Sequence, residues 1–469
     1  MRNPVQTCHL RPNDRNGWQP GPKLQTPALC FQRLIDGCAS PWYPAVDARG
    51  RRGRSGPKVI GTMVCLWPVV TCPVSQNVHA QGGALRVKIT SVETFLVNLG
   101  DGPGSRNLPF VKVHTDEGIH GVGEAYSCGP DRATVEVIKD FASWIEGKDP
   151  RDVEGLWHLM YAGSRFPGGS VVNAAISGIE HALWDIAGKA AGLPVYRLLG
   201  GRCRDKIRVY QNPGGATPEE MADNAVRLID RYGYTALKLS PLPTGYQEMP
   251  WRELLRAATG RVEAVRRAVG DTVEIGVDPH ARLFEPFRAI ELCRALEPFD
   301  LLFVEEPLRP ENYDALAKVR EHVSVPIATG EMLYTRHEFR DLIAKQACDI
   351  AQPDICLAGG ILETKKIAAL AESAYVTVAP HNPCGPIATA VNVHFAAATT
   401  NFLILEYKPD EGARAEIVDH PMTIRDGYLE IPEVPGLGID LNETAVGRYP
   451  FRPWHRSFNY RTDGSLAFQ

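Results

Sequence analysis

Three features that would assign a chain to a class at first sight are missing from these 469 residues. No hydrophobic run approaches the roughly 20 residues that a membrane-spanning helix needs. Neither sign of charge dominates, because the formal net charge is −4, which argues against a nucleic acid as the main partner. The eleven cysteines show no CxxC pairs and no zinc-finger spacing, so neither a disulfide framework nor a zinc site is indicated. We therefore expect a globular, cytoplasmic protein with no membrane partner.

The first 84 residues differ in composition from the rest of the chain. They contain five of the eleven cysteines and many Pro, Arg and Trp residues, and they sustain no helical or strand period. We therefore expect residues 1–84 to form a poorly ordered extension. A basic stretch, an apolar run and a small residue at Ala80 imitate a signal peptide, although Pro68 interrupts the run. Export is thus the alternative to a cytoplasmic location.

Residues 85–206 predict a small α+β domain. An alternating run over 86–99 predicts a strand, and residues 110–126 predict two strands joined by a turn at 116–118. Apolar residues at helical spacing then predict a helix over 174–192, which Gly-Leu-Pro ends.

Residues 207–407 alternate short β-rich runs with longer amphipathic stretches. The predicted strands are 207–212, 235–240, 273–278, 301–306, 325–331, 349–354, 375–381 and 402–407. Eight βα units over about 200 residues are typical of a (β/α)8-type TIM barrel. A doubly wound open sheet is the alternative, and the even spacing of the units disfavours it.

Polar side chains end seven consecutive predicted strands. They are Lys238 and Ser240, Asp278 and His280, Glu305 and Glu306, Glu331, Asp354, His381, and Glu406. In a parallel barrel the carboxyl ends of the strands form one mouth, where active sites lie. Side chains two apart on a strand point the same way, so Asp278 and His280 are expected on one face.

Several carboxylates at one mouth would repel one another strongly unless a cation held them. Oxygen donors without a soft ligand fit Mg²⁺, or Mn²⁺, better than zinc. The strand ends therefore predict a divalent metal site.

Six motifs occur along the chain in the order ALWDIAGKAAGLPVYRLLGG, GVDPH, FVEEP, ATGE, AQPDICLAGG and APHNPCGP. In this order they resemble the enolase superfamily, its mandelate racemase branch, and the acid-sugar dehydratases of the galactonate dehydratase type within it. The resemblance covers about residues 86–469 and implies an enolase-like modified barrel capped by residues 85–206. It also implies that residues 408–469 return to the capping domain and that the protein is a homo-oligomer.

The resemblance assigns roles to the strand-end residues. Asp278, Glu305 and Glu331 would bind the metal ion, with Glu306 in a supporting position. Asp354 and His381 would form a dyad in which the carboxylate raises the basicity of the imidazole. His381 would then remove the proton alpha to the substrate carboxylate, and the metal would stabilise the charge that develops.

Three further residues complete the implied site. His280 would act as the general acid that protonates the departing β-hydroxyl, with mere hydrogen bonding to substrate hydroxyls as the alternative. Lys238 would neutralise the substrate carboxylate, and Glu406, when protonated, would hydrogen-bond to it. Racemases of this superfamily carry Lys-x-Lys on the second strand, but Ser240 stands here in place of the second lysine.

These residues predict a Mg²⁺-dependent dehydratase that converts a sugar acid to a 2-keto-3-deoxy acid. A racemase or epimerase of 2-hydroxy acids is the second hypothesis, because His280 could serve as a second base on the side opposite His381. A non-catalytic protein that keeps the fold is a third, which the complete set of ligands and acid–base groups disfavours. Loops at 98–109, with Arg106, at 161–173, with Arg165, and at 240–251, with Tyr246 and Trp251, are the candidates for substrate selection.

Overall fold

The computed structural model of the chain describes residues 87–100, 106–453 and 457–467, which belong to one compact unit. The extension predicted for residues 1–84 lies outside the described residues. In the described ranges, no helix combines the length and the apolar character that crossing a membrane requires.

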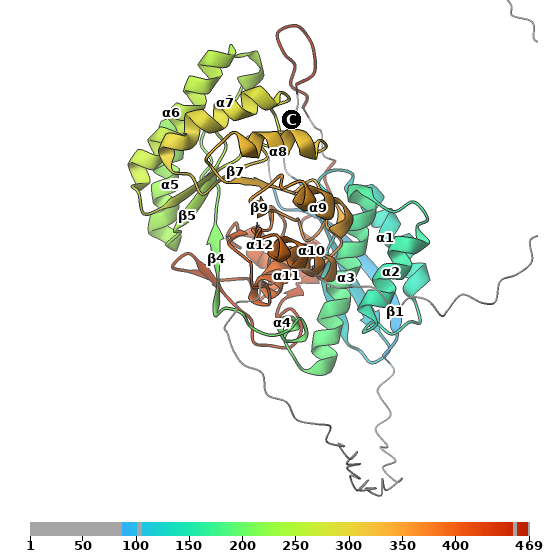
Figure 1. The fold of residues 1–469 in the computed structure, drawn as a ribbon. Helices are drawn as coiled ribbons and strands as arrows, with labels where there is room; N and C mark the ends of the chain where they lie inside the picture. Colours follow the sequence, from blue (N-terminus) through green and yellow to red (C-terminus); the bar gives the residue numbers. More distant parts are fainter. Residues whose placement is uncertain (1–86, 101–105, 454–456, 468–469) are drawn as a thin grey trace, which may run out of the picture. The chain divides into compact units, whose positions relative to one another are not determined.

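The capping domain is built on a three-stranded antiparallel sheet in the order β1-β2-β3. The strands are β1 (Ile89–Asn98), β2 (Asn107–Thr115) and β3 (His120–Glu124). They match the strands and the turn predicted over 86–126. The helices are α1 (Asp131–Ile145), α2 (Val153–Gly163) and α3 (Gly169–Ala191), followed by the short α4 (Val195–Leu198). Helices α1, α2 and α3 lie beside β1 in Figure 1. Helix α3 ends as predicted at Gly192, which has a left-handed backbone (φ 68°).

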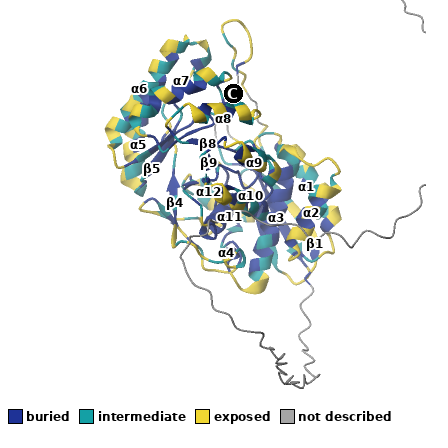
Figure 2. Ribbon diagram, viewed as in Figure 1, coloured by how far each residue is buried: buried dark blue, intermediate teal, exposed yellow. Residues whose placement is uncertain are grey.

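Two glycines of β3 allow α3 to lie directly on the sheet. A Cβ atom at Gly121 would lie 2.0 Å from the carbonyl oxygen of Ala182, and one at Gly123 would lie 1.9 Å from that of Gly178. Most residues along the middle of α3 are buried (Figure 2). The helix therefore forms the centre of the domain and has no solvent-facing stripe there.

The second part of the chain is a closed parallel barrel. Its strands are β4 (Lys206–Tyr210), β5 (Ala236–Leu239), β6 (Glu274–Val277), β7 (Phe303–Glu305), β8 (Ile327–Thr329), β9 (Ile350–Ala351), β10 (Thr377–Val378) and β11 (Leu405–Glu406). Strands β5 to β10 pair in sequence order, and β11 pairs in parallel with β4. Single parallel bridges, Gln211 to Leu237 and Val378 to Phe402, join the remaining neighbours. The predicted TIM barrel is confirmed, and each predicted strand overlaps one observed strand.

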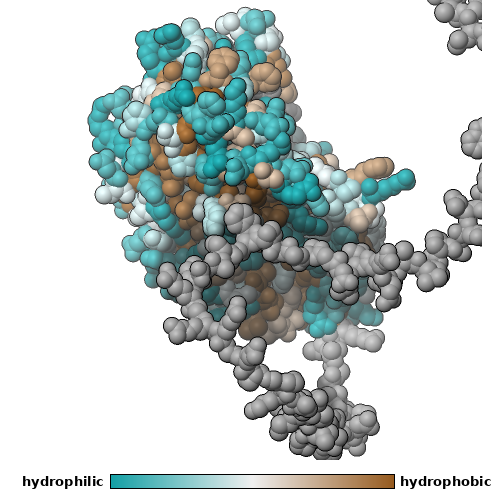
Figure 3. Space-filling view, in the orientation of Figure 1, coloured by the Kyte–Doolittle hydropathy of each residue, from teal (hydrophilic) through white to brown (hydrophobic). Residues whose placement is uncertain are grey.

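Seven longer helices connect the barrel strands within the described residues. They are α5 (Pro218–Tyr232), α6 (Trp251–Val269), α7 (Pro286–Leu296), α8 (Tyr313–Glu321), α9 (Thr335–Ala344), α10 (Ile361–Ser373) and α11 (Pro386–Ala397), with 3-10 turns at Tyr246–Glu248 and Glu297–Phe299. Figure 3 shows a mainly hydrophilic surface over α5 to α7, as expected for amphipathic helices that bury one face against the strands.

Large and small side chains fill the barrel interior in alternation. This cluster comprises Tyr210, Ala236, Phe303, Ala328, Ile350, Ala379 and Ile404. Gly276 is part of the same fit, because a Cβ there would lie 2.6 Å from the Phe303 ring. The interior below the mouth is thus a packed core.

The segment after β11 contacts both parts of the chain. It contains α12 (Ala413–Glu416), β12 (Val418–Asp419), β13 (Ile424–Arg425), β14 (Tyr428–Glu430), β15 (Asp440–Leu441) and α13 (Glu443–Val446). Strand β14 pairs antiparallel with β4 of the barrel. On the capping domain, Asp440 accepts a hydrogen bond from His120 at 2.5 Å, and Glu443 forms an ion pair with Lys112.

Two buried carboxylates of the capping domain hold the first turns of two barrel helices. Glu124 accepts hydrogen bonds from the backbone N–H groups of Gly385 and Ala388 at α11, at 2.5 and 2.9 Å. Glu180 accepts from the N–H groups at positions 361 and 362 of α10, at 2.8 and 2.9 Å. A negative charge is favourable at a helix N-terminus. Burial nevertheless raises the pKa of both carboxyl groups to about 7.

Candidate active site

Three carboxylates from adjacent strands meet at the mouth of the barrel. Asp278 follows β6, Glu305 ends β7 and Glu331 follows β8, and one oxygen of each lies within 4.8 Å of the others. Asp278 and Glu305 are buried. Burial raises the pKa of both groups, that of Asp278 to about 6 with a contribution from the Glu331 charge. A buried set of oxygen donors that repel one another fits Mg²⁺ or Mn²⁺.

Lys238 supplies a buried positive charge to this cluster. Its Nζ atom lies 2.6 Å from Glu305 Oε1, 3.4 Å from Asp278 Oδ2 and 3.5 Å from Glu406 Oε1. Burial alone would lower the pKa of the lysine, but the surrounding carboxylates outweigh it and raise the pKa well above its ordinary value. Lys238 is therefore positively charged at neutral pH.

Asp354 and His381 form a hydrogen-bonded pair on the next two strand ends. The His381 Nδ1 atom lies 2.9 Å from Asp354 Oδ2, and its Nε2 atom lies 3.4 Å from Glu331 Oε2. The free ring nitrogen therefore faces the carboxylate cluster. Burial lowers the pKa of His381, but the charges of Glu331 and Asp354 more than compensate and raise it well above its ordinary value.

His280 also lies beside the cluster, but not by the geometry that the sequence predicted. Strand β6 ends at Val277, and His280 has a left-handed backbone with φ 57°. The expectation that strand alternation brings Asp278 and His280 to one face is therefore wrong. A tight turn joins them instead: the His280 N–H donates to Asp278 Oδ1 at 2.7 Å, and His280 Nε2 lies 3.2 Å from Asp278 Oδ2. Burial, Lys238 and Arg282 lower the pKa of His280 to about 4.

Glu406, at the end of β11, closes the ring of strand-end groups. Its Oε2 atom accepts a hydrogen bond from the Asn382 N–H at 3.1 Å. Burial raises the pKa of Glu406, but the charges of Lys238 and His381 outweigh that effect and hold it below its ordinary value. The carboxyl group is thus ionised at neutral pH in the protein alone.

Two family models match the chain. The model described as enolase C-terminal domain-like matches residues 220–445, and that of the mandelate racemase / muconate lactonizing enzyme N-terminal domain matches residues 102–200. A D-galactonate dehydratase of Ralstonia nicotianae is 37% identical over 372 residues, which cover 76% of this chain and 95% of that protein. The chain belongs to the mandelate racemase branch of the enolase superfamily.

Other members of the superfamily are similar over the same region. A D-xylonate dehydratase of Haloferax volcanii is 39% identical over 381 residues, covering 78% of this chain and 90% of that protein. The crystal structure of an enolase from Agrobacterium radiobacter with bound sodium and L-malate is 40% identical, with a TM-score of 0.78, and covers 81% of this chain and 100% of that one. An enolase from Pantoea ananatis with bound D-gluconate and magnesium is 32% identical, with a TM-score of 0.74, and covers 81% and 99%.

Two residues of this superfamily member contribute to the site although the sequence reasoning missed them. Gln352, after β9, donates a hydrogen bond to Glu305 Oε2 at 2.6 Å and so orients that carboxylate. Tyr210, at the end of β4, has a buried hydroxyl with no hydrogen-bond partner among the described residues, and its ring lies 5.7 Å from Lys238 Nζ. Both are polar residues at strand ends, which is the signal that identified the others.

Glu306 hydrogen-bonds to the end of β8 and to the residue that follows it. It accepts hydrogen bonds from the Thr329 hydroxyl at 2.8 Å and from the Gly330 N–H at 2.9 Å. These contacts hold the loop that carries Glu331. In place of the second lysine, Ser240 has a buried hydroxyl without a hydrogen-bond partner in the described part of the chain.

The candidate loops for substrate selection lie in different surroundings. Arg106 contacts the Tyr126 hydroxyl, and its charge interacts with that of Glu331, so it lies near the mouth. Arg165 stacks on the exposed Phe166. The loop at 240–251 packs on α6 and α7 and helps to line a cavity of about 110 Å³.

Proposed function

We propose that this protein is a Mg²⁺-dependent dehydratase of a sugar acid, a hydro-lyase that forms a 2-keto-3-deoxy acid. The relatives named D-galactonate dehydratase and D-xylonate dehydratase support the reaction class. The observation that carries the proposal is the placement of two histidines around one carboxylate cluster. His381 Nε2 lies 3.4 Å from Glu331 and His280 Nε2 lies 3.2 Å from Asp278.

Asp278, Glu305 and Glu331 would hold the Mg²⁺ ion. When bound, the ion supplies positive charge next to the substrate carboxylate, where negative charge develops as the alpha proton leaves. Lys238 adds a second positive charge from beneath the cluster, at 2.6 Å from Glu305. Gln352 keeps Glu305 oriented through its hydrogen bond.

His381, in its neutral form, would remove the proton from C2 of the substrate through Nε2, the ring nitrogen that faces the cluster. Asp354 holds the opposite nitrogen at 2.9 Å and so fixes the ring orientation and the tautomer. The electron pair of the broken C–H bond then forms a C2–C3 double bond as the hydroxyl group on C3 departs.

His280 would donate a proton to the departing hydroxyl, which leaves as water. The imidazole is neutral in the protein alone because its pKa is about 4. A bound substrate brings its own negative charge to the mouth, which raises the pKa of a neighbouring imidazole. The enol product then takes a proton at C3 and loses the proton of its C2 hydroxyl group, which gives the 2-keto acid.

Ser240 distinguishes this site from a racemase that uses two bases. The residue offers a hydroxyl where the second lysine of such racemases would stand, so proton exchange on the second face of C2 would fall to His280. A racemase or epimerase is therefore the alternative outcome of the functional test.

The test is a screen of the full chain with Mg²⁺ against mono- and diacid sugars, with 2-keto acid trapped by semicarbazide. Formation of keto acid that stops with a chelator and in both His381→Asn and His280→Asn supports the dehydratase. The control variant is His322→Asn, because His322 follows α8 on the surface. Deuterium uptake at C2 without keto acid, in wild type in D₂O, would support the racemase instead.

A homo-oligomer is also part of the proposal, and light scattering coupled to size-exclusion chromatography measures it directly.

A further inference from the structure

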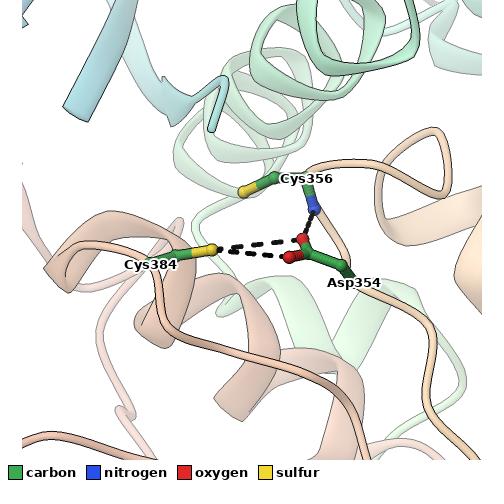
Figure 4. Close-up of side chains that lie close together, drawn as sticks. All are labelled: Asp354, Cys356 and Cys384. Atoms are coloured by element: carbon green, nitrogen blue, oxygen red, sulfur yellow. Dashed lines mark hydrogen bonds between the residues drawn. The ribbon is translucent and has the colours of Figure 1, made fainter. Parts of the chain in front are cut away.

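Behind the Asp354–His381 pair lies a second cluster of metal-binding groups. The thiols of Cys356 and Cys384 and the carboxylate of Asp354 converge in the interior, as Figure 4 shows, and all three residues are buried. We propose that these three side chains form a binding site for a soft divalent cation, Zn²⁺ or Cd²⁺, that is separate from the Mg²⁺ site.

The distances suit such an ion. One ligand atom of each residue lies within 4.8 Å of the others, and Cys384 Sγ lies 3.8 and 4.0 Å from the two Asp354 oxygens. In a tetrahedral zinc site with Zn–S bonds of about 2.3 Å, neighbouring ligand atoms lie roughly 3.5 to 3.8 Å apart. Small side-chain rotations are therefore enough to close the site.

The donor set selects the kind of ion. Two sulfurs and one oxygen favour Zn²⁺ or Cd²⁺ over Mg²⁺, whereas the three carboxylates at the mouth offer oxygen alone. Nearby charge favours a cation as well, because the Glu124 carboxylate interacts electrostatically with both thiols. Cys356 of the motif PDIC and Cys384 of the motif HNPC therefore determine that this site prefers a soft ion to Mg²⁺.

Binding exchanges protons for the ion. Burial raises the pKa of both thiols, that of Cys356 to about 11, so both carry a proton in the metal-free protein. Ligation forms two S–metal bonds and one O–metal bond and releases two protons to solvent. No electron transfer is involved.

Occupation of this site would remove the partner of His381. The Asp354 carboxylate now orients the imidazole through the contact at 2.9 Å, and the soft ion would take that carboxylate as a ligand. If the protein is the proposed dehydratase, stoichiometric Cd²⁺ inhibits it and excess Mg²⁺ does not restore activity. The inhibition rests on the proposed function, but the binding itself does not.

The experiment is a titration of the full chain with Cd²⁺ in saturating Mg²⁺, followed by the ultraviolet absorption of thiolate-to-cadmium charge transfer. Carboxylate ligands give no such band, so Cd²⁺ at the mouth is silent. We expect the first equivalent of Cd²⁺ that wild type binds to give the charge-transfer band. Its apparent affinity should fall at least about tenfold in Cys384→Ser and in Cys356→Ser. The matched control is Cys348→Ser, a buried cysteine outside the cluster, which should titrate like wild type.

Identical titrations of wild type, Cys384→Ser and Cys356→Ser would overturn the proposal. X-ray absorption at the cadmium edge of the wild-type protein decides the matter if a variant does not fold. Sulfur scatterers in the first equivalent support the site, and an all-oxygen shell overturns it. Neither measurement needs a substrate, so an inactive protein would refute the dehydratase and leave this test intact.

Discussion

Replacing Lys238 by Met tests whether the carboxylate cluster depends on an internal positive charge. The lysine is 2% exposed and has three carboxylate oxygens within 3.5 Å. Met fills a similar volume, so the change removes the charge with little loss of packing. Removing one partner of a buried ion pair costs about 3 to 5 kcal/mol, because the remaining charges are left uncompensated. We expect Lys238→Met to lower the free energy of unfolding by that amount in the presence of a chelator.

The second half of this prediction concerns the effect of Mg²⁺ on the stability of Lys238→Met. A divalent cation held by Asp278, Glu305 and Glu331 would compensate the charges that the lysine leaves behind. The loss of stability should therefore shrink by at least about 2 kcal/mol when Mg²⁺ is saturating. Urea denaturation followed by circular dichroism, with and without Mg²⁺, measures both values.

The control is Lys318→Met, because Lys318 is exposed on α8 and should change stability by less than about 0.5 kcal/mol. A loss below about 1 kcal/mol for Lys238→Met in chelator would refute the reasoning about the cluster, since an internal charge would then be dispensable. A larger loss that Mg²⁺ leaves unchanged would refute the assignment of the metal ligands.

Further predictions concern the buried carboxyl group of Glu180, the packing of β3 on α3, and the bound metal. The pKa of Glu180 is raised from 4.5 to about 7, so its contribution to stability is complete below 4.5 and is lost as the pH rises through 7. In Glu180→Gln, the decline in unfolding free energy between those pH values should be smaller by about 3 kcal/mol in urea titrations. Gly123→Ala should destabilise by about 3 kcal/mol in the same assay, because its Cβ would lie 1.9 Å from a carbonyl oxygen of α3. Chelation of metal should lower the melting temperature of wild type, and added Mg²⁺ should restore it; equal melting curves would contradict a bound divalent ion.

The sequence was most informative about residues whose position follows from strand order. Parallel strands of a barrel all end at one mouth, so the rhythm of apolar runs predicted that the polar strand-end residues meet there. The choice of Asp278, Glu305 and Glu331 among them as metal ligands came from the family resemblance. The helix over 174–192 was predictable for a similar reason, because its apolar spacing and its terminal glycine are both local signals.

Other features depend on backbone geometry or on distant contacts, and these escaped prediction. The position of His280 follows from a left-handed turn after β6, which strand alternation does not describe. The ionised state of Glu406 follows from Lys238 and His381, which reach it from other strands. The cluster behind Asp354 needs the fold to bring Cys356 and Cys384 together from separate motifs.

The pairing of β4 has a consequence for how the chain is made. This strand is the first of the barrel in the sequence, but β11 and β14, which pair with its two edges, lie close to the C-terminal end of the chain. Strand β4 therefore leaves the ribosome long before β11 and β14, which pair with it, have been synthesised. Strands β1 to β3 can pair early, because they are close together in the sequence. Nascent chains should thus hold paired β1 to β3 and an open barrel until translation is almost complete.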